Sequence, residues 1–312
     1  MTKLLTTTAA LSLLLAGGAF AQDKDSCKTV RYSDPGWTDI SSTNALLKTV
    51  LEPLGYTSDI KSLSVPITFR SLASNDLDIF LGNWMPTQTE IVDPMVEAGE
   101  LDVLNVNLSG NRFTLAVPSY VAEAGVKSFD DLAANADKFD HTIYGIEAGA
   151  SVNENMLRMI KDGAYGLKDW ELKESSEQGM LAQVGRAENR EEWIVFPAWE
   201  PHPMNTEFDL TYLSGGDEYF GPNYGSAEVR TVTRPGFAAD CPNLTKLLEN
   251  MDFSVDLENT MMNEILNEGT AADDAARQAI EKQPDLLDAW LDGVTTASGE
   301  PGLPAVKSSL GL

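Results

Sequence analysis

Short apolar runs alternate with amphipathic helical segments along the first part of the chain, and this alternation constrains the fold more than any other feature. Residues 30–32, 56–63 and 77–81 are predicted strands, and helical patterns follow from about Ser42 and from Pro66. The order β–α–β–α–β is typical of a parallel sheet, whose ligands bind beyond the carboxyl ends of the strands. We therefore expect an α/β protein with its site at strand ends.

The same alternation starts again near residue 113, without visible sequence repetition. Strands are predicted at 113–117, 142–146 and 192–196, with helices between them, and a further strand at 229–233. The end of the chain is predicted to be helical, and its tail from Ser298 is expected to fray. These last helices are expected at about 255–267, 271–282 and 284–291.

The first 21 residues are predicted to be a secretory signal. Lys3 precedes an apolar stretch from about Ala9 to Ala16, and Ala19-Phe20-Ala21 forms a small-x-small cleavage site. No later segment reaches the roughly 18 apolar residues of a membrane helix. The cleavage site has no cysteine, so a lipid anchor is not expected. We expect a soluble exported protein, periplasmic in a host with two membranes.

Two cysteines, Cys27 and Cys241, are present without the CxxC spacing of metal or redox sites. In an oxidising compartment, a disulfide between them is the economical expectation. It would tie the first strand to a segment near the end of the chain. We therefore predict a discontinuous first domain, 22–112 plus 218–312, that encloses a second at 113–217. Two crossings between domains form a hinge, and a hinge makes a clamshell.

The chain is strongly acidic, with a formal net charge of −26. Such a field repels nucleic acid and anionic lipid and favours the approach of cations. The same charge also serves solvation and solubility, including in a salty habitat. The charge therefore argues against a nucleic-acid partner and supports a cationic ligand only weakly.

Three tryptophans, Trp37, Trp84 and Trp199, each follow a predicted strand, in the segments PGWTD, GNWMP and PAWEPH. An indole there is well placed to line a cleft, where its electron-rich face can hold a methylated cation. Asp39, two residues after Trp37, can accept a hydroxyl proton, attract a positive nitrogen or cap the next helix. The other tryptophans lack this context and are expected to be packing residues: Trp170, Trp193 and Trp290.

The chain offers little for catalysis or metal binding. It contains only two histidines, and no GxSxG, P-loop, HExxH or GxGxxG motif occurs. His141 is expected to be exposed, whereas His202, three residues after Trp199, can contact a ligand or make a structural hydrogen bond. Glu191 and Glu192 point to opposite faces of a strand, so they are a poor acid/base couple. We expect no enzyme activity, no cofactor and no metal site.

Several unusual segments occur in order along the full chain: PGWTD, LGNWMP, YGIEAG, FPAWEPHPMN, FGPNYG, ADCPN and PDLLDAWLDGV. They make the chain similar to the glycine betaine/choline-type (quaternary amine) substrate-binding proteins of ABC importers, most closely the choline-binding branch. The resemblance implies two α/β domains, each a mainly parallel sheet flanked by helices, that close on a ligand. It also implies docking on an inner-membrane permease, and we expect a monomer.

The resemblance also assigns roles to residues. Trp37, Trp84 and Trp199 match the aromatic box that holds a trimethylammonium group, and Asp39 matches the acidic residue that hydrogen-bonds the choline hydroxyl. The two cysteines match a disulfide pair of the same branch. Phe113 stands where the box usually has a tyrosine.

A second departure is Ala150, where an asparagine is expected after the GIE-x-G turn. Glu147, Asn153 and Asn155 are candidates to replace it, and a carboxylate ligand would need donors such as His202 or backbone N–H groups. We rank choline first, trimethylamine N-oxide second and glycine betaine third, with a sulfonium analogue also open. A ligand-sensing module and, less favoured, an exported amine-processing enzyme are the alternatives.

Overall fold

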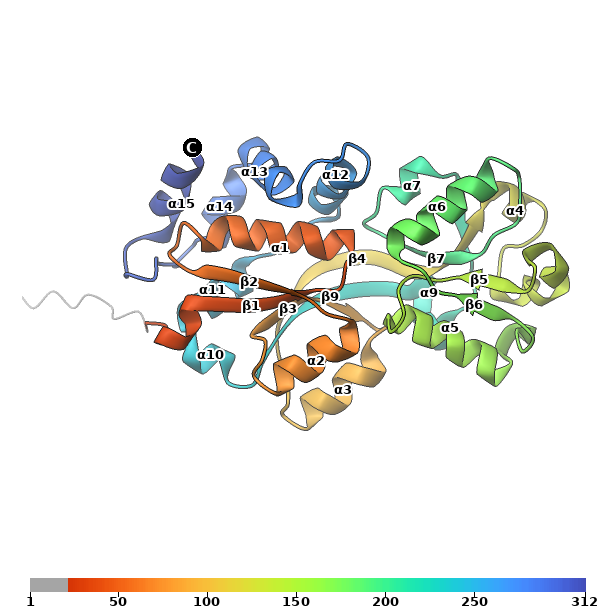
Figure 1. Cartoon of the computed structure of the whole chain (residues 1–312), viewed down its shortest axis with the longest axis horizontal. Helices are drawn as coiled ribbons and strands as arrows, with labels where there is room; N and C mark the ends of the chain where they lie inside the picture. The colour runs from red at the N-terminus through yellow and green to blue at the C-terminus, as the bar shows by residue number, and fades with distance from the viewer. Residues whose placement is uncertain (1–21) are drawn as a thin grey trace, which may run out of the picture.

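One long strand, β4 (Asp102–Pro118), connects the two halves of the molecule (Figure 1). Residues 102–112 pair with β9 (Ser226–Thr233), whereas residues 113–118 pair with β7 (Phe196–Trp199) and β8 (Leu210–Tyr212). We call the half around β9 lobe 1 and the half around β7 and β8 lobe 2. The computed structural model describes residues 22–312, so the predicted signal, 1–21, lies outside the described residues.

The main sheet has the strand order β2-β1-β3-β9-β4-β7, and β8 also pairs with β4. The strands β1 (Thr29–Asp34), β2 (Thr57–Ser62) and β3 (Ile79–Met85) pair in parallel, as predicted. A separate parallel pair in lobe 2 consists of β5 (Thr142–Tyr144) and β6 (Glu171–Lys173). The α/β class is thus confirmed, but the main sheet is mixed rather than mainly parallel, because β4 pairs antiparallel with β7, β8 and β9, and β9 with β3.

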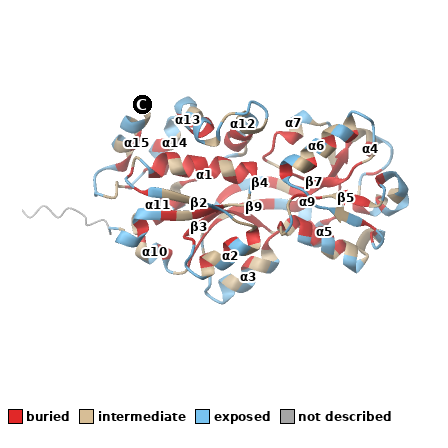
Figure 2. Ribbon diagram, in the orientation of Figure 1, coloured by how far each residue is buried: buried red, intermediate tan, exposed pale blue. Residues whose placement is uncertain are grey.

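In lobe 1, α1 (Thr38–Leu51) covers one face of the sheet, and α2 and α3 cover the other (Figure 1). Leu46, Leu47, Val50 and Leu51 are fully buried, because α1 lies between the sheet and the later helices α12 and α13. The strand β3 is buried along its whole length (Figure 2). The other lobe 1 helices are α2 (Val65–Ala73), α3 (Thr89–Glu97), α10 (Phe237–Asp240), α11 (Pro242–Asn250), α12 (Val255–Leu266), α13 (Ala272–Lys282), α14 (Asp285–Trp290) and α15 (Gly302–Leu310).

Lobe 2 is built around the end of β4 and carries shorter helices. No helix among residues 22–312 is long and apolar enough to cross a bilayer. The lobe 2 helices are α4 (Ser119–Glu123), α5 (Ser151–Asp162), α6 (Glu177–Glu188), α7 (Met204–Glu207), α8 (Asp217–Phe220) and α9 (Pro222–Gly225). Short 3-10 helices lie at Asp25–Lys28 in lobe 1 and, in lobe 2, at Phe129–Asp131, Ala133–Phe139 and Ala164–Gly166.

The ends of several elements differ from the predictions in ways that affect the tryptophans. Helix α1 begins at Thr38 rather than near Ser42, so Trp37 is its N-cap residue and Asp39 lies in its first turn. Trp84 and Trp199 lie within β3 and β7 rather than beyond strand ends, because Trp84 pairs with Val229 and Trp199 with Phe113. Two of the three tryptophans therefore lie in strands, and the third directly precedes a helix.

The expected fraying of the tail from Ser298 is wrong. Thr295 and Pro301 form a β-bridge, and α15 follows it. Val306 of this helix is fully buried, and Lys307 forms an ion pair with Asp288 of α14 at 2.9 Å. Packing against the rest of lobe 1 thus orders this segment, although its own sequence does not predict a helix there.

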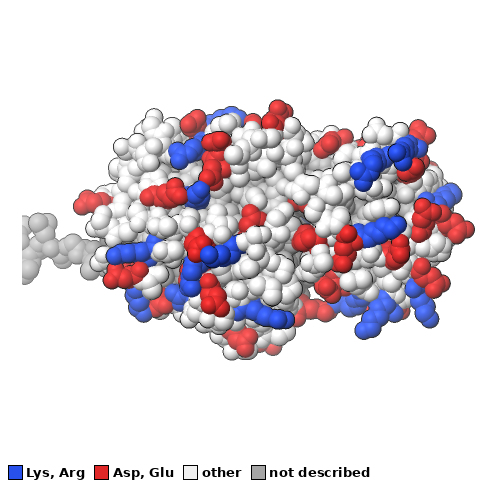
Figure 3. All heavy atoms as spheres, in the orientation of Figure 1, with Lys and Arg blue, Asp and Glu red and all other residues white. Residues whose placement is uncertain are grey.

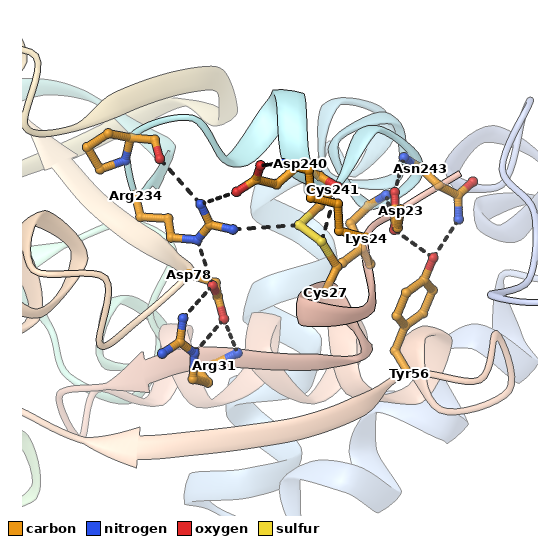
Figure 4. Close-up of a disulfide and its surroundings, with 12 residues drawn as sticks. Asp23, Lys24, Cys27, Arg31, Tyr56, Asp78, Arg234, Asp240, Cys241 and Asn243 are labelled. Carbon is orange, nitrogen blue, oxygen red and sulfur yellow. Dashed lines mark hydrogen bonds and ion pairs between the residues drawn. A yellow bond between two sulfur atoms is a disulfide. The ribbon is translucent and has the colours of Figure 1, made fainter. Parts of the chain in front are cut away.

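The predicted disulfide between Cys27 and Cys241 is confirmed (Figure 4). The two Cα atoms lie 5.8 Å apart although 214 positions separate them in the sequence. The bond joins the segment that enters β1 to the start of α11, so both ends of the chain belong to lobe 1.

A partly buried ion cluster lies beside the disulfide (Figure 4). Arg234 donates to Asp78 Oδ1 and to Asp240 Oδ2, both at 2.9 Å, and Arg31 donates to Asp78 at 2.8 Å. Burial opposes ionisation of Asp78, but the hydrogen bonds from Arg31 and Arg234 hold its pKa below the ordinary value. The cluster joins β1, the segment before β3 and the segment after β9.

Acidic side chains are scattered over both lobes on the face that Figure 3 shows, and lysine and arginine lie among them. That face has no continuous patch of one sign. This distribution suits the role in solvation that the sequence suggested for the charge.

Replacement of both cysteines by serine is expected to lower the free energy of unfolding by up to about 5 kcal/mol, because it removes a cross-link that spans 214 positions. Urea titration of both proteins measures this difference. A reductant should lower the wild-type midpoint and leave the double variant unchanged. Equal midpoints for the two oxidised proteins would contradict the prediction.

Candidate functional site

An aromatic cavity lies between the lobes, and the empty space within its walls is about 350 Å³ when open solvent is included. Lobe 1 contributes the start of α1 and the end of β3 with its following loop, and lobe 2 contributes β7 and the start of α5. The wall is therefore complete only when the lobes meet. The lining residues are Trp37, Asp39, Trp84, Thr87, Gln88, Phe113, Ile146, Ser151, Val152 and Trp199.

Three of the aromatic rings form a row across the sheet. Phe113 lies between Trp84, at a centroid distance of 5.6 Å, and Trp199, at 5.5 Å, with interplanar angles of 69° and 63°. Phe113 and Trp199 are register partners in β4 and β7. Since backbone pairing holds these residues and such tilted contacts are favourable, the row is fixed by the fold.

The polar edges of two indoles are bound by carboxylates. Trp84 Nε1 donates to Asp39 Oδ2 at 3.0 Å, and Trp37 Nε1 donates to Glu147 Oε1 at 2.6 Å. The second of these bonds crosses between the lobes, because Glu147 lies between β5 and α5. With the N–H groups occupied, these rings offer the cavity apolar, electron-rich surface.

Asp39 holds the one carboxyl group on the cavity wall. The residue is 2% exposed, and its second oxygen, Oδ1, has no hydrogen-bond partner among residues 22–312. Burial, followed by the nearby Glu177, raises the pKa of Asp39 to about 7, although the bond from Trp84 opposes this shift. An unpaired buried acceptor is costly, so this atom is a natural place for a ligand donor.

Further buried or half-buried acids lie near the cavity. Burial raises the pKa of Glu147 to about 7, and Glu177 adds to the shift while hydrogen bonds oppose it. Burial also raises the pKa of Glu258 of α12, with a contribution from Asp39. The mutual repulsion of these groups means that a cation in the cavity would be stabilised and an anion opposed.

Two more polar side chains of the lining follow Trp84 in the chain. Gln88 is already paired, since it accepts from Asn83 Nδ2 at 2.9 Å and donates to the Gly82 carbonyl at 3.2 Å. Thr87 is 6% exposed, and its Oγ1 is buried without a partner in the described part of the chain. Asp39 and Thr87 therefore bring unpaired polar atoms to the cavity wall.

Five predicted ligand-binding residues line the cavity: Trp37, Asp39, Trp84, Phe113 and Trp199. Five other lining residues were not predicted from the sequence: Thr87, Gln88, Ile146, Ser151 and Val152. Their only signal is position, because they follow the Trp84 segment or lie in or just after the GIE-x-G turn. Trp170, Trp193 and Trp290 lie outside the lining, in agreement with their expected packing role.

The remaining candidates lie behind the lining, so their placement does not support direct ligand contact. Asn153 accepts from Ile146 N at 3.1 Å and donates to the Ile146 and Glu147 carbonyl oxygens at 3.0 Å, which holds the turn. Ala150 is buried as the N-cap residue of α5. Asn155 donates to the Tyr219 carbonyl.

His202 is also a supporting residue. It is 2% exposed, its Nδ1 accepts from Met204 N at 2.9 Å, and its ring packs edge-on against Trp199 at 4.9 Å. Its Nε2 lies 3.3 Å from Glu177 Oε1. Nowhere in residues 22–312 do three or more His, Cys, Asp or Glu side chains gather in a way that could hold a metal ion.

Known proteins resemble this chain in sequence and in fold. A solved structure described as an ABC-transporter choline-binding protein in complex with choline is 50% identical, with a TM-score of 0.91, over 92% of this chain and 100% of that one. A second, described as unliganded and semi-closed, has 51% identity, a TM-score of 0.86 and the same coverage.

A curated relative is the glycine betaine/carnitine transport binding protein GbuC of Listeria monocytogenes, 32% identical over 165 residues. The match covers 53% of this chain and 53% of that protein. Residues 28–282 match the family model described as the substrate-binding domain of ABC-type glycine betaine transport systems. The match covers most of the chain, and the chain therefore belongs to this family of solute-binding proteins.

Proposed function

We propose that this protein captures a small trimethylammonium compound in the aromatic cavity and delivers it to the permease of an ABC importer. Choline is the first candidate, trimethylamine N-oxide the second and glycine betaine the third. The protein would act in the periplasm as a monomer, after removal of residues 1–21. The proposed domains are 22–112 plus 218–312 and 113–217, and the cleft between them would close on the ligand without a chemical step.

The unpaired Oδ1 atom of Asp39 is the observation on which the choice of choline rests. A trimethylammonium head has no hydrogen bonds to offer, so the faces of Trp37, Trp84 and Trp199 and the ring of Phe113 suit it. The hydroxyl group at the other end of choline can donate to Asp39 Oδ1. The 50% identical structure described as a choline complex supports the same choice.

The other two ligands fit this carboxyl less well. The oxygen of trimethylamine N-oxide and the carboxylate of glycine betaine only accept hydrogen bonds, so an ionised Asp39 would repel them. They would require a neutral Asp39 or a donor such as Thr87 Oγ1. Gln88 is already paired within the protein, so the hydroxyl groups of Thr87 and Ser151 and the N–H groups at the start of α5 are the donors that the lining leaves for such ligands.

Replacement of Trp84 by alanine is expected to weaken choline binding at least about thirtyfold, because a desolvated cation–π contact is worth about 2 kcal/mol. Isothermal calorimetry measures the affinity. Trp193→Ala is the matched control, since this half-buried indole packs against Phe139 outside the cavity. Equal affinities for the wild type and Trp84→Ala would remove Trp84 from the proposed cage.

An uncharged isostere tests the charge of the ligand. The compound 3,3-dimethylbutanol keeps the shape and the hydroxyl group of choline but lacks its positive charge. It is expected to bind far more weakly, because it loses both the cation–π contacts and the field of the buried acids around Asp39. Competition calorimetry compares the two compounds, and similar affinities would contradict a cation cage.

The affinity for choline is expected to rise between pH 5.5 and pH 8. Asp39, with a pKa of about 7 in the empty cavity, is largely protonated at pH 5.5 and ionised at pH 8, and a cation favours the ionised form. The dissociation constant should increase up to about tenfold for each pH unit below 7. Calorimetry across this range measures it.

Asp39→Asn is the matched control for this pH dependence, and it should remove most of the slope while leaving a smaller part from Glu147. A ligand that accepts a hydrogen bond from neutral Asp39, such as the N-oxide, should show the opposite slope. Choline affinity that falls as pH rises would refute the role given to Asp39.

A further inference from the structure

Helix α1 has no capping side chain next to it in the sequence. Its N-cap residue is Trp37, whose side chain makes no capping hydrogen bond. The first N–H groups of a helix need acceptors, which serine, threonine, aspartate or asparagine usually provide from the N-cap position. The acceptor for this helix must therefore come from elsewhere.

A glutamate of lobe 2 provides it. Glu177 Oε2 accepts a hydrogen bond from Thr38 N at 2.9 Å, and Glu177 Oε1 accepts one from Thr38 Oγ1 at 2.6 Å. Thr38 is the first residue of α1, and Glu177 is the first residue of α6, 139 positions later (Figure 1). A carboxylate at this end of a helix also interacts favourably with the helix dipole.

The surroundings of this contact make it strong. Glu177 is 1% exposed and Thr38 is 3% exposed, so water does not compete for the hydrogen bonds. Because Met204 N donates to His202 Nδ1, the ring proton of a neutral His202 lies on Nε2, which donates to Glu177 Oε1 at 3.3 Å. The carboxylate thus has three donors, two from lobe 1 and one from its own lobe.

Thr38 lies between two residues of the cavity wall, Trp37 and Asp39. A bond that fixes the backbone of Thr38 also fixes the direction in which both neighbours project. The indole of Trp37 is held separately by Glu147. Both contacts join lobe 1 to lobe 2, so both must break when the lobes separate.

We propose that Glu177 is a positioning residue that caps α1 across the cleft and thereby couples closure of the lobes to assembly of the cage. Glu177 is not part of the cavity lining, so it does not touch the ligand, and it positions the cavity wall through its hydrogen bonds to Thr38. This inference rests on the proposed function only in that choline is the probe. His202 orients the cap and links it to Trp199.

Loss of the cap should act on the dissociation rate. The ligand meets the open protein, in which the cap is absent, whereas escape requires the cap to break. Glu177→Gln keeps the size of the side chain and removes its charge, and hydrogen bonds to charged groups are the stronger ones. We expect choline to dissociate about tenfold faster, with an association rate within about twofold of the wild type.

Stopped-flow tryptophan fluorescence with choline measures both rates. Glu188→Gln, at the other end of α6, is the matched control and should leave both rates unchanged. An unchanged dissociation rate in Glu177→Gln, or an equal change in Glu188→Gln, would overturn the proposal. Thermal unfolding without ligand checks that each variant is folded.

Substitutions at Thr38 separate this cap from a general structural role. Thr38→Ser keeps the hydroxyl donor and should preserve the wild-type rates, whereas Thr38→Val removes it and should speed dissociation. Choline should dissociate from the Thr38→Val/Glu177→Gln double variant no faster than from the faster single variant, because both substitutions remove the same interaction. Additive effects would show that the two residues act independently, against the proposal.

A distance measurement without ligand keeps the test independent of choline. Spin labels at Glu97→Cys in lobe 1 and Lys168→Cys in lobe 2 lie on exposed positions. The cap predicts a short-distance population that Glu177→Ala depletes, and identical distributions would overturn it. Failure of the wild type to bind choline would instead contradict the proposed function, and the spin-label result would still decide the cap.

Discussion

The pairing of β4 with strands of both lobes is the constraint on which the site depends. The strand changes partners between Arg112 and Phe113: residues up to Arg112 pair with β9, and residues from Phe113 onward pair with β7 and β8. Phe113 therefore lies where the two lobes join, in register with Trp199 and edge-on to Trp84. Backbone hydrogen bonds define the centre of the aromatic wall, and the remaining walls come from the helix starts of α1 and α5.

Buried acids give this wall its electrostatic character. Asp39, Glu147 and Glu258 all lie in surroundings that disfavour their ionised forms, and Glu177 adds to the repulsion on the first two. Such crowding is unfavourable in an empty cavity, and one positive charge would offset part of it. A methylated cation cannot hydrogen-bond these carboxyls through its head, so its contribution is charge and apolar contact. The same field opposes a ligand with a net negative charge.

The sequence predicts the parallel strands, the helices after residue 255 and the disulfide, because apolar periodicity and cysteine pairing are local or countable signals. It fails for residues 102–112 of β4, where asparagine, serine and glycine interrupt the apolar pattern. Asn107 is tolerated there because its side chain donates to the Leu81 carbonyl and to Thr231 Oγ1, both at 3.0 Å. Those partners are distant in the sequence, and so are the neighbours that order α15.

The residues of the cavity also divide into some that the sequence predicts and some that it does not. Trp37, Trp84, Trp199 and Asp39 could be predicted, since an indole near a strand end is unusual enough to be informative. Thr87 could not, because threonine has many roles and only the cavity shows that its hydroxyl group is unpaired. The supporting residues are harder still: the bonds of Glu177 and His202 depend on how α1, α6 and the segment after β7 meet.

The start of helix α5, at Ala150, gives a second reason to prefer one ligand over another. As the N-cap residue of α5, Ala150 has no side-chain acceptor for the first N–H groups of that helix, and Ser151 and Val152 of the first turn line the cavity. The positive end of α5 and the unpaired oxygen of Asp39 thus belong to one cavity. A hydroxyl group can use both, since it accepts from an N–H group and donates to a carboxylate. An N-oxide can use only the first, and on this ground we propose it after choline even though its methylated head suits the same rings.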